Sequence, residues 1–391
     1  MSGAADLRTT LEAIGPRATR ERDLGTWLGL FVATTLLMGV GTPPVPIVGA
    51  LLACAGTLLL SLRWRVGPLA ILVLLFVGIW LRTLNPYGGW SDVLTVVQAA
   101  IRAMTEGLPP YGVGFEESIP PGAPFAYGPV ALAWYLPFVE EPRRLELFLS
   151  CLVVALLAVR GRMLGLAVYA VLAPLLVTAG DGSNDTSAGI LILLALLVAQ
   201  RQPVAGAILL AIAAAFKPYA AAWLPPLLAY GGFVPILVAF LLGSLAAWGP
   251  ALLVWGPERI LWSFRTADAV HQVPYYSLAW VTGGLGLPES VWQALRLVAG
   301  AGTALVGMLS VRSARSLIVA GAAIFVVTLF SGWWSTFAYL GAIAPVLCWH
   351  LDDWLGLGSQ RIRWPGDPVG RLTEWADARL PIRRPATPGI G

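Results

Sequence analysis

The sequence predicts an all-α membrane protein that crosses the bilayer many times. Hydrophobic residues make up 58% of the chain and charged residues only 12%, whereas roughly a quarter of the residues of a soluble domain are charged. Apolar runs near the length needed to cross a hydrocarbon core, roughly 17 to 25 residues, recur along the whole chain. Lipid offers backbone groups no hydrogen-bonding partner, so each run is expected to be a helix.

Twelve predicted spans lie between a cytoplasmic tail at residues 1–25 and a basic cytoplasmic tail at residues 352–391. The first run follows a polar head without a cleavage site in the expected place, so we expect it to persist as a span. The spans are Thr26–Gly41, Val45–Leu62, Val66–Leu84, Tyr127–Val139, Leu145–Val159, Met163–Ala179, Asn184–Ala199, Pro203–Ala229, Gly232–Trp255, Val291–Ser310, Ser316–Phe330 and Trp334–His350.

Arginines set the predicted orientation. They gather in the N-terminal tail, at Arg63 and Arg65, at Arg312 and Arg315, and in the C-terminal tail. The positive-inside rule places all four groups in the cytoplasm. Two long segments then face outside, a first outer loop at residues 85–126 and a second at residues 256–290.

The middle of the chain allows two topologies. Twelve full spans leave Arg160, Arg162 and Arg201 outside, against the rule. In the alternative, Tyr127–Val139 is re-entrant and Pro203–Ala229 breaks into two half-helices at Lys217-Pro218, which moves Asp181 and Asp185 outside. Both topologies keep the two long loops external.

The first outer loop begins with an amphipathic pattern. Its apolar positions repeat at helical spacing and its polar positions occupy the opposite face, which predicts a helix lying on the membrane surface. The apolar positions are Val93, Val97, Ala100, Ile101 and Met104, and the polar ones are Thr95, Gln98, Arg102 and Glu106.

Asp92 directly precedes this predicted helix and has two interpretations. Aspartate is a frequent N-cap residue before an apolar-periodic run. A carboxylate at the mouth of a membrane cavity can also serve as a general base toward an acceptor hydroxyl. The N-cap position does not exclude the catalytic role.

Lys217, the single lysine of the chain, lies within a predicted span. An ionisable residue at that depth is a candidate functional residue, because its charge costs several kcal/mol unless it is paired or reaches water. One interpretation is a structural pair with Asp181, Asp185 or Glu146, and the other is a ligand for an anionic substrate. Pro218 favours a kink or break at this point.

The second outer loop combines cations with aromatic residues. Arg259, Arg265 and His271 are candidates for holding a phosphate and stabilising it as a leaving group. Tyr275 and Tyr276 are candidates for binding substrate beside it. The alternative for each residue is an interfacial belt of aromatic side chains and snorkelling arginines.

Cysteine and histidine usage predicts no metal centre and no cofactor. Cys54, Cys151 and Cys348 lie in apolar runs, and neither His271 nor His350 has a cysteine at ligand spacing. The sequence leaves the use of a divalent cation open. The arginines are scattered instead of forming one stripe, which gives no indication of nucleic-acid binding.

Several short motifs between Trp90 and Trp280 together resemble the glycosyltransferase 87 family, part of the GT-C superfamily of polytopic membrane transferases. The matching residues are Asp92, Gln98-Ala99, Gly107, Pro110-Tyr111, Pro124-Phe125, Tyr127, Pro129, Gly206 and Ala213-Ala214-Ala215-Phe216-Lys217-Pro218. The resemblance implies a GT-C-like bundle of about 12 transmembrane helices in the plasma membrane, with the active site on the extracytoplasmic side.

The resemblance also implies an activity. It is an inverting transfer of a sugar, expected to be mannose, from a polyprenyl phosphate to a lipid-linked or glycan acceptor, with Asp92 as base. Gln98, Tyr111 and Tyr127 fall among the matching motifs and are candidates for binding substrate. The chain departs from the usual pattern at Asp181-Gly182-Ser183-Asn184, where a Gly-Gln-Asn-like turn is common, at Tyr127-Gly128-Pro129, and in having two spans before the one that leads into Asp92.

Other functions fit parts of the same pattern. An intramembrane lysine and a proline-broken helix also occur in secondary transporters and would suit a translocase for lipid-linked sugars. Against transport stand the absence of an internal repeat and the long outer loop with its acidic residue. A transferase of the same fold with a different donor sugar, such as arabinofuranose or glucose, is the third possibility.

Overall fold

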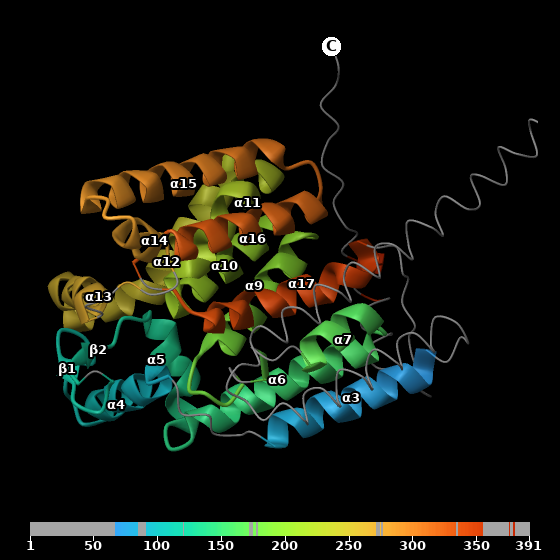
Figure 1. Cartoon of the computed structure of the whole chain (residues 1–391), viewed down its shortest axis with the longest axis horizontal. Helices are drawn as coiled ribbons and strands as arrows, with labels where there is room; N and C mark the ends of the chain where they lie inside the picture. The colour runs from blue at the N-terminus through green and yellow to red at the C-terminus, as the bar shows by residue number, and fades with distance from the viewer. Residues whose placement is uncertain are drawn as a thin grey trace, which may run out of the picture. The chain divides into compact units, whose positions relative to one another are not determined.

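The computed structural model describes residues 67–84, 91–119, 121–171, 175–176, 179–270, 274, 277–333, 335–354, 375 and 378–379 (Figure 1). These residues are mostly helical, as predicted, with one small antiparallel hairpin of strands β1 (Gly114–Phe115) and β2 (Ala123–Pro124). The first two predicted spans, most of both tails, Cys54, His271, Tyr275 and Tyr276 lie outside the described residues.

The chain divides into two compact units. One contains residues 1–85, 151–177 and 347–364, and the other contains residues 86–150, 178–346 and 365–391. Helices α6 (Pro142–Val159) and α17 (Leu340–Trp354) each contribute to both units, whereas α3 (Gly67–Leu84) and α7 (Met163–Val171) belong to the first unit only.

In the first unit, a buried arginine ties α3 to α7. Arg82 is fully buried and donates to the carbonyls of Gly78, Tyr169 and Ala170 at 3.0, 2.8 and 3.1 Å. The two latter carbonyls belong to the last turn of α7. A cation at a helix C-terminus interacts favourably with the carbonyl end of the helix dipole. Arg82 thus joins the end of α3 to the carbonyl end of α7.

An aspartate from the end of α17 caps the start of α7. The two carboxylate oxygens of Asp352 accept from the backbone N–H groups of Leu164 and Gly165 at 3.0 and 2.9 Å. Gly165 permits this close approach, since a Cβ there would lie 1.9 Å from the carbonyl oxygen of Cys348. The neighbouring Asp353 forms an ion pair with Arg162.

The second unit contains most of the described helices. They are α4 (Val93–Thr105), α5 (Pro129–Tyr135), α9 (Asp185–Ala199), α10 (Pro203–Phe216), α11 (Leu224–Gly231), α12 (Phe233–Trp255), α13 (Pro257–Val270), α14 (Leu278–Gly284), α15 (Glu289–Ser310) and α16 (Ala314–Phe330). Short 3₁₀ helices occur at Leu136–Phe138, Pro218–Trp223 and Phe337–Tyr339. In this unit α10 packs between α9 and α12, and α15 lies beside α16 (Figure 1).

Among the described helices, α12 and α15 are long and apolar enough to cross a membrane. The 23 residues of α12 extend over about 34 Å, against a hydrocarbon thickness of about 30 Å. Within the most apolar 18-residue stretch of each helix, only 22% of the stretch is buried in α12 and 11% in α15. The core helix of a soluble protein would be mostly buried, so these exposed apolar faces favour lipid as the neighbour.

The predicted span Pro203–Ala229 is not one continuous helix. Helix α10 ends at Phe216, Lys217 is extended with φ −142° and ψ 115°, and the chain then reverses through a 3₁₀ helix into α11. Pro218 explains the break, since it lacks an N–H and disfavours helical geometry at the preceding residue. At the other end of the hairpin, a Cβ on Gly231 would lie 2.5 Å from the Cβ of Pro203.

The predicted span Tyr127–Val139 is also interrupted. Helix α5 has seven residues, about 10 Å of rise, which is too short to cross a hydrocarbon core. At its start, Gly128 donates to the carbonyl of Phe216 at 3.2 Å. A Cβ on Gly128 would lie 1.8 Å from the carbonyl oxygen of Ala215, so only glycine allows this approach. Both interruptions agree with the alternative topology, in which these two segments do not cross.

Candidate functional site

The turn that precedes α9 holds the start of the first outer loop. Ser91 donates its N–H to the carbonyl of Asp181 at 3.0 Å, and Leu94 donates to the carbonyl of Gly182 at 2.9 Å. Gly182 has φ +97°, and a Cβ there would lie 2.4 Å from the carbonyl oxygen of Ser91. Two segments far apart in the sequence therefore meet, and they must lie on the same side of any bilayer. We call residues 181–185 the aspartate turn.

Asp92 lies between the two residues that dock on the aspartate turn. It occupies the N-cap position of α4, as predicted, but its side chain makes no capping hydrogen bond. Its Oδ2 instead accepts from the backbone N–H of Ile119 at 2.8 Å. No second hydrogen bond to this carboxylate occurs among the described residues, and the side chain is half-buried. One carboxylate oxygen is thus held by the loop while the other is available.

Lys217 forms a buried ion pair at the break after α10. Its Nζ lies 2.7 Å from Oδ1 of Asp185, and both side chains are buried. The hydroxyl of Tyr219 also donates to Asp185. Asp185 is one of the three carboxylates that the sequence analysis named as structural partners for Lys217. The binding of a donor phosphate by Lys217 stays a prediction.

Three tyrosine rings surround the same ammonium group. The Nζ of Lys217 lies 5.0 Å from the ring centre of Tyr219, 5.6 Å from that of Tyr127 and 5.7 Å from that of Tyr339. Cation–π contacts of this kind contribute about 0.5 to 2 kcal/mol each, more when water is excluded. We call Asp185, Lys217 and the three tyrosines the Lys217 cluster.

A second buried carboxylate supports the first turn of α9. Glu146 Oε2 accepts from the N–H of Ser187 at 3.1 Å, and Oε1 accepts from the hydroxyls of Ser187 and Tyr135. The indole of Trp134 donates to the same serine hydroxyl at 3.0 Å. Glu146 was a candidate partner for Lys217 but joins α5, α6 and α9 instead. This network fixes the direction of α9 and so the position of Asp185.

Asp181 begins the aspartate turn and is buried. Burial disfavours its charged form and raises the pKa of this carboxyl to about 6, although hydrogen bonds from Ser183 and the nearby charge of Lys217 oppose the rise. Its Oδ1 accepts from the N–H of Ser183 at 2.8 Å, which closes the turn. Asp181 therefore shapes the turn, and its burial holds the pKa of its carboxyl above the ordinary value.

Two of the candidate substrate-binding residues have other partners in the structure. Tyr111 is fully buried, with its ring against Phe125 and Trp255, and its hydroxyl donates to the carbonyl of Tyr127 at 3.0 Å. Gln98 is half-buried on α4 and donates to the carbonyl of Glu140 at 3.4 Å. Of these three residues, only Tyr127 has its ring beside the ammonium group of Lys217.

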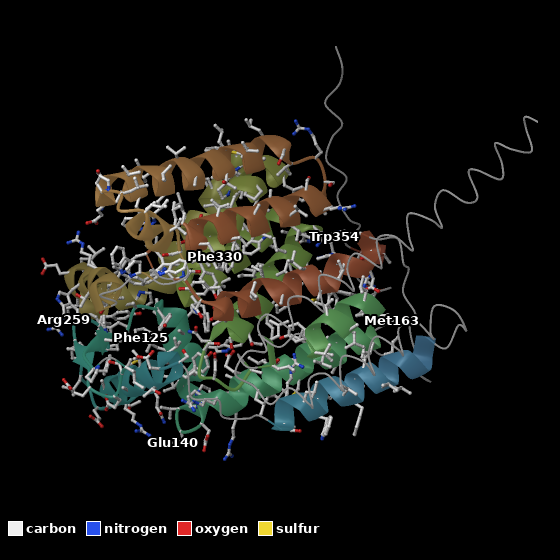
Figure 2. The ribbon with its side chains drawn as sticks, in the orientation of Figure 1. Phe125, Glu140, Met163, Arg259, Phe330 and Trp354 are labelled. Atoms are coloured by element: carbon white, nitrogen blue, oxygen red, sulfur yellow. The ribbon has the colours of Figure 1, made fainter. Side chains whose placement is uncertain are left out.

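The two outer loops contact each other through α13. The backbone N–H of Gly112 in the first loop donates to the hydroxyl of Ser263 at 3.0 Å. Arg259 packs against Gly112: a Cβ added to Gly112 would lie 2.8 Å from Cγ of Arg259. The rest of the Arg259 side chain is exposed (Figure 2). Arg265 is exposed on the same helix. Within the described residues, neither guanidinium has an ion pair or hydrogen bond with the Lys217 cluster or Asp92.

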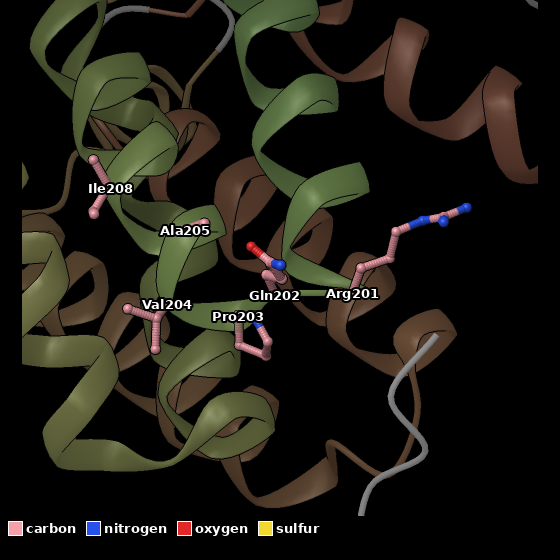
Figure 3. Close-up of a pocket in the computed structure, with 6 residues that line it drawn as sticks. All are labelled: Arg201, Gln202, Pro203, Val204, Ala205 and Ile208. Carbon is pink, nitrogen blue, oxygen red and sulfur yellow. The ribbon is translucent and has the colours of Figure 1, made fainter. Parts of the chain in front are cut away.

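A surface hollow of about 480 Å³ lies at the other end of α9 and α10. It is lined by Arg201, Gln202, Pro203, Val204, Ala205 and Ile208 (Figure 3). The Lys217 cluster involves the first residue of α9 and the residue after α10. Helices of about 15 residues separate their ends by roughly 20 Å. The hollow is therefore not part of the candidate site.

The sequence indicated some members of this site and missed others. Asp92, Lys217 and Tyr127 were candidates, and Asp185 was one of three possible partners. Tyr219 was missed although it directly follows Lys217-Pro218, and Tyr339 has no local signal in the sequence. Among the described residues no group of three His, Cys, Asp or Glu side chains is placed to hold a metal ion.

Comparisons with known proteins identify no relative of this chain. No family model, no curated protein and no solved structure matches the chain.

Proposed function

We propose that the protein is a polytopic membrane glycosyltransferase. It transfers a sugar, expected to be mannose, from a polyprenyl phosphate to a hydroxyl of a lipid-linked or glycan acceptor on the extracytoplasmic face. The observation that supports this most is the docking of Ser91 and Leu94 on the aspartate turn. It places a half-buried carboxylate, Asp92, in the same unit as a buried lysine and three tyrosines.

The proposed step needs one base and one good leaving group. The free oxygen of the Asp92 carboxylate takes the proton of the acceptor hydroxyl, whose oxygen then attacks C1 of the sugar. The bond between C1 and the phosphate oxygen breaks, and polyprenyl phosphate leaves with the electron pair. Attack opposite the leaving group inverts the configuration at C1. The N–H of Ile119 orients the carboxylate by binding its other oxygen.

Positive charge near the leaving phosphate would stabilise the charge that develops on it. Lys217 is the buried candidate, and its charge is balanced by Asp185 before substrate binds. Arg259 and Arg265 are exposed on α13, which packs against the first outer loop. His271, Tyr275 and Tyr276 follow this helix in the chain. Their role in binding the donor is part of the proposal.

The direct experiment is sugar transfer by the purified full-length chain reconstituted in liposomes. Polyprenyl phosphomannose labelled in the sugar is supplied with a mixed lipid acceptor fraction. We expect transfer by the wild type and a loss of about 10²- to 10⁴-fold with Asp92→Asn, the range associated with general-base catalysis. The asparagine keeps an oxygen for Ile119. Glu106→Gln, an exposed acid at the end of α4, is the matched control and should keep full activity.

A second function has one specific observation in its favour. The α10–α11 hairpin with a charged residue at its break resembles the broken helices that form substrate sites in secondary transporters. A transporter or lipid-linked sugar translocase would move substrate across liposomes that contain no acceptor. Substrate movement without transfer, unaffected by Asp92→Asn, would favour that function over the transferase.

A further inference from the structure

The side-chain amide of Asn184 is buried in the aspartate turn, and it has no hydrogen-bonding partner among the described residues. Its side chain is 0% exposed, and neither Nδ2 nor Oδ1 has a partner among the described residues. Each buried donor or acceptor left unpaired costs folding free energy, so native proteins seldom keep one without a reason. Arg162 and Ser335 are the other described residues with an unpaired buried side-chain atom, and each has one such atom. Asn184 alone in that set has two unpaired polar atoms, a donor nitrogen and an acceptor oxygen.

The position of Asn184 makes this more informative. It is the N-cap residue of α9, where an asparagine side chain ordinarily accepts from the N–H of the second or third helical residue. Here it makes no such bond. The N–H of Ser187, the third residue of the helix, is taken by Glu146 from α6 at 3.1 Å. Glu146 therefore caps this N–H in place of Asn184, which leaves the amide of Asn184 free for a different partner.

The chemistry of a free amide limits what that partner is. A phosphate offers only acceptors at neutral pH and would leave Oδ1 unpaired, and a cation would leave Nδ2 unpaired. Two adjacent hydroxyl groups satisfy both atoms, because one hydroxyl accepts from Nδ2 while its neighbour donates to Oδ1. Such a pair of hydroxyls is characteristic of a sugar ring.

The surroundings point to the same ligand. The turn binds the backbone on both sides of Asp92, through Asp181 and Gly182. The residue after Asn184 is Asp185, the partner of Lys217. Asn184 thus belongs to the segment that connects the proposed base with the buried cation. A sugar held between acceptor and phosphate would lie in this region.

We propose that the Asn184 amide binds two adjacent hydroxyls of the transferred sugar and so helps to determine which sugar is accepted. This inference rests on the proposed function. Such a site discriminates strongly, because a sugar that lacks one of the two hydroxyls leaves a buried amide atom unpaired. When no sugar is bound, the same atoms are the ones without a partner.

The experiment measures transfer by the reconstituted full-length chain with polyprenyl phosphomannose and with its 2-, 3-, 4- and 6-deoxy analogues. We expect Asn184→Ala to lower kcat/KM for the parent donor by about 10- to 100-fold, the loss associated with one or two buried hydrogen bonds. Two deoxy donors with neighbouring positions should be poor substrates of the wild type. The same two should suffer no further loss in Asn184→Ala, because the partner of the missing hydroxyl is already gone.

Two comparisons separate this role from a structural one. Asn184→Leu removes both unpaired atoms and keeps the branching of the side chain, so the thermal midpoint of the substrate-free protein should stay the same or rise. Ser335→Ala also deletes an unpaired buried atom and should keep the wild-type order of donor preference. A fall in the thermal midpoint of Asn184→Leu together with equal losses for all donors would instead assign Asn184 to the fold, for example through a bound water.

The remaining outcomes are distinct. If the wild type transfers sugar and Asn184→Ala does so with the same kcat/KM and the same donor preference, the Asn184 inference is wrong while the transferase proposal stands. If the wild type transfers no sugar from any polyprenyl phosphate donor to a broad acceptor mixture, the transferase proposal is wrong and the inference falls with it.

Discussion

At the scale of single residues, Lys217 and Asp185 are buried together, and each charge makes the burial of the other tolerable. An isolated ammonium or carboxylate in a low-dielectric interior costs several kcal/mol, and the cost is offset only when the partner and further hydrogen bonds are well placed. Here the ion pair is 2.7 Å long, Tyr219 adds a hydrogen bond, and three rings face the cation. The pair is therefore expected to matter more when one partner is removed than when both are replaced.

We predict that Asp185→Asn and Lys217→Met each lower the free energy of unfolding by about 3 to 5 kcal/mol, the usual loss when a buried charge loses its partner. The double variant Asp185→Leu with Lys217→Met should be more stable than either single variant. Thermal unfolding in detergent measures this. The matched control is the exposed pair of Arg102 and Glu140, 3.0 Å long, where Glu140→Gln should cost less than about 1 kcal/mol. Equal losses at the two pairs would contradict the prediction.

Asp181 gives a pH dependence of stability. Its pKa in the folded protein is about 6, above the ordinary value of 3.8, because burial penalises the charged form. The folded state therefore binds the proton more tightly than the unfolded state, so the contribution of this group is fully present below pH 4 and is lost as pH rises through 6. We predict that Asp181→Asn, which keeps an acceptor for Ser183, raises the thermal midpoint at pH 7.5. The gain should shrink toward zero at pH 4, and a gain independent of pH would refute this account.

At the residue scale, the sequence indicates a contact only where its signal is local. Lys217 was identifiable because a charge in an apolar run needs an explanation, and the list of its possible partners included Asp185. The three-ring surroundings were not identifiable, because Tyr339 reaches the cluster only through the packing of distant helices. Tyr111 was chosen because an aromatic residue in an outer loop suits a sugar. In the structure its ring packs against Phe125 and Trp255, and its role in binding substrate stays a prediction.

At the scale of elements, the contact between the aspartate turn and α4 depends on a glycine. Gly182 combines a φ of +97° with a close approach to the carbonyl of Ser91. A side chain at this position would strain the turn and push the start of α4 away. The position of Asp92 is thus set by backbone contacts instead of by its own side chain.

We predict that Gly182→Ala reduces sugar transfer by at least about 10-fold, since small displacements of a catalytic group have effects of this size. The control is Gly122→Ala, which has a similar φ of +94° but no atom within 4 Å of the added Cβ. It shares the backbone strain and lacks the clash, so it should lose stability without a comparable loss of activity. Equal activity losses in the two variants, measured in the same liposome assay, would show that strain alone is responsible.

The sequence predicted some elements better than others for physical reasons. The helix after Asp92 and the break at Lys217-Pro218 follow from apolar periodicity and from proline geometry, which act within a few residues, and both are present. The shortness of α5 could not be deduced with the same certainty, because an apolar run of 13 residues suits a buried segment as well as a span. The docking of the aspartate turn involves backbone atoms, which leave no pattern in the sequence.

At the scale of the whole molecule, contacts within the second unit favour one of the two predicted topologies, for a chain that spans a membrane. Glu140, which directly follows the segment 127–139, pairs with Arg102 on α4 in the first outer loop. The aspartate turn binds Ser91 of the same loop. Twelve full spans would place residue 140 and the aspartate turn on the opposite face from that loop, across the hydrocarbon core. The re-entrant topology places all of them on one face, and it places Arg201 in the cytoplasm, in agreement with the positive-inside rule.

We therefore predict the side on which single cysteines react in intact cells, in a variant whose Cys54, Cys151 and Cys348 are replaced by serine. Cysteines placed at Ile119, Glu140 and Glu258, all exposed, should react with a membrane-impermeant maleimide added from outside. A cysteine at Gln202, also exposed, should react only after the membrane is permeabilised. Twelve full spans predict the reverse at two of these positions, with residue 140 protected and residue 202 labelled. The pair at 140 and 202 therefore decides the topology, and labelling at 119 and 258 shows that the reagent reaches the outer loops.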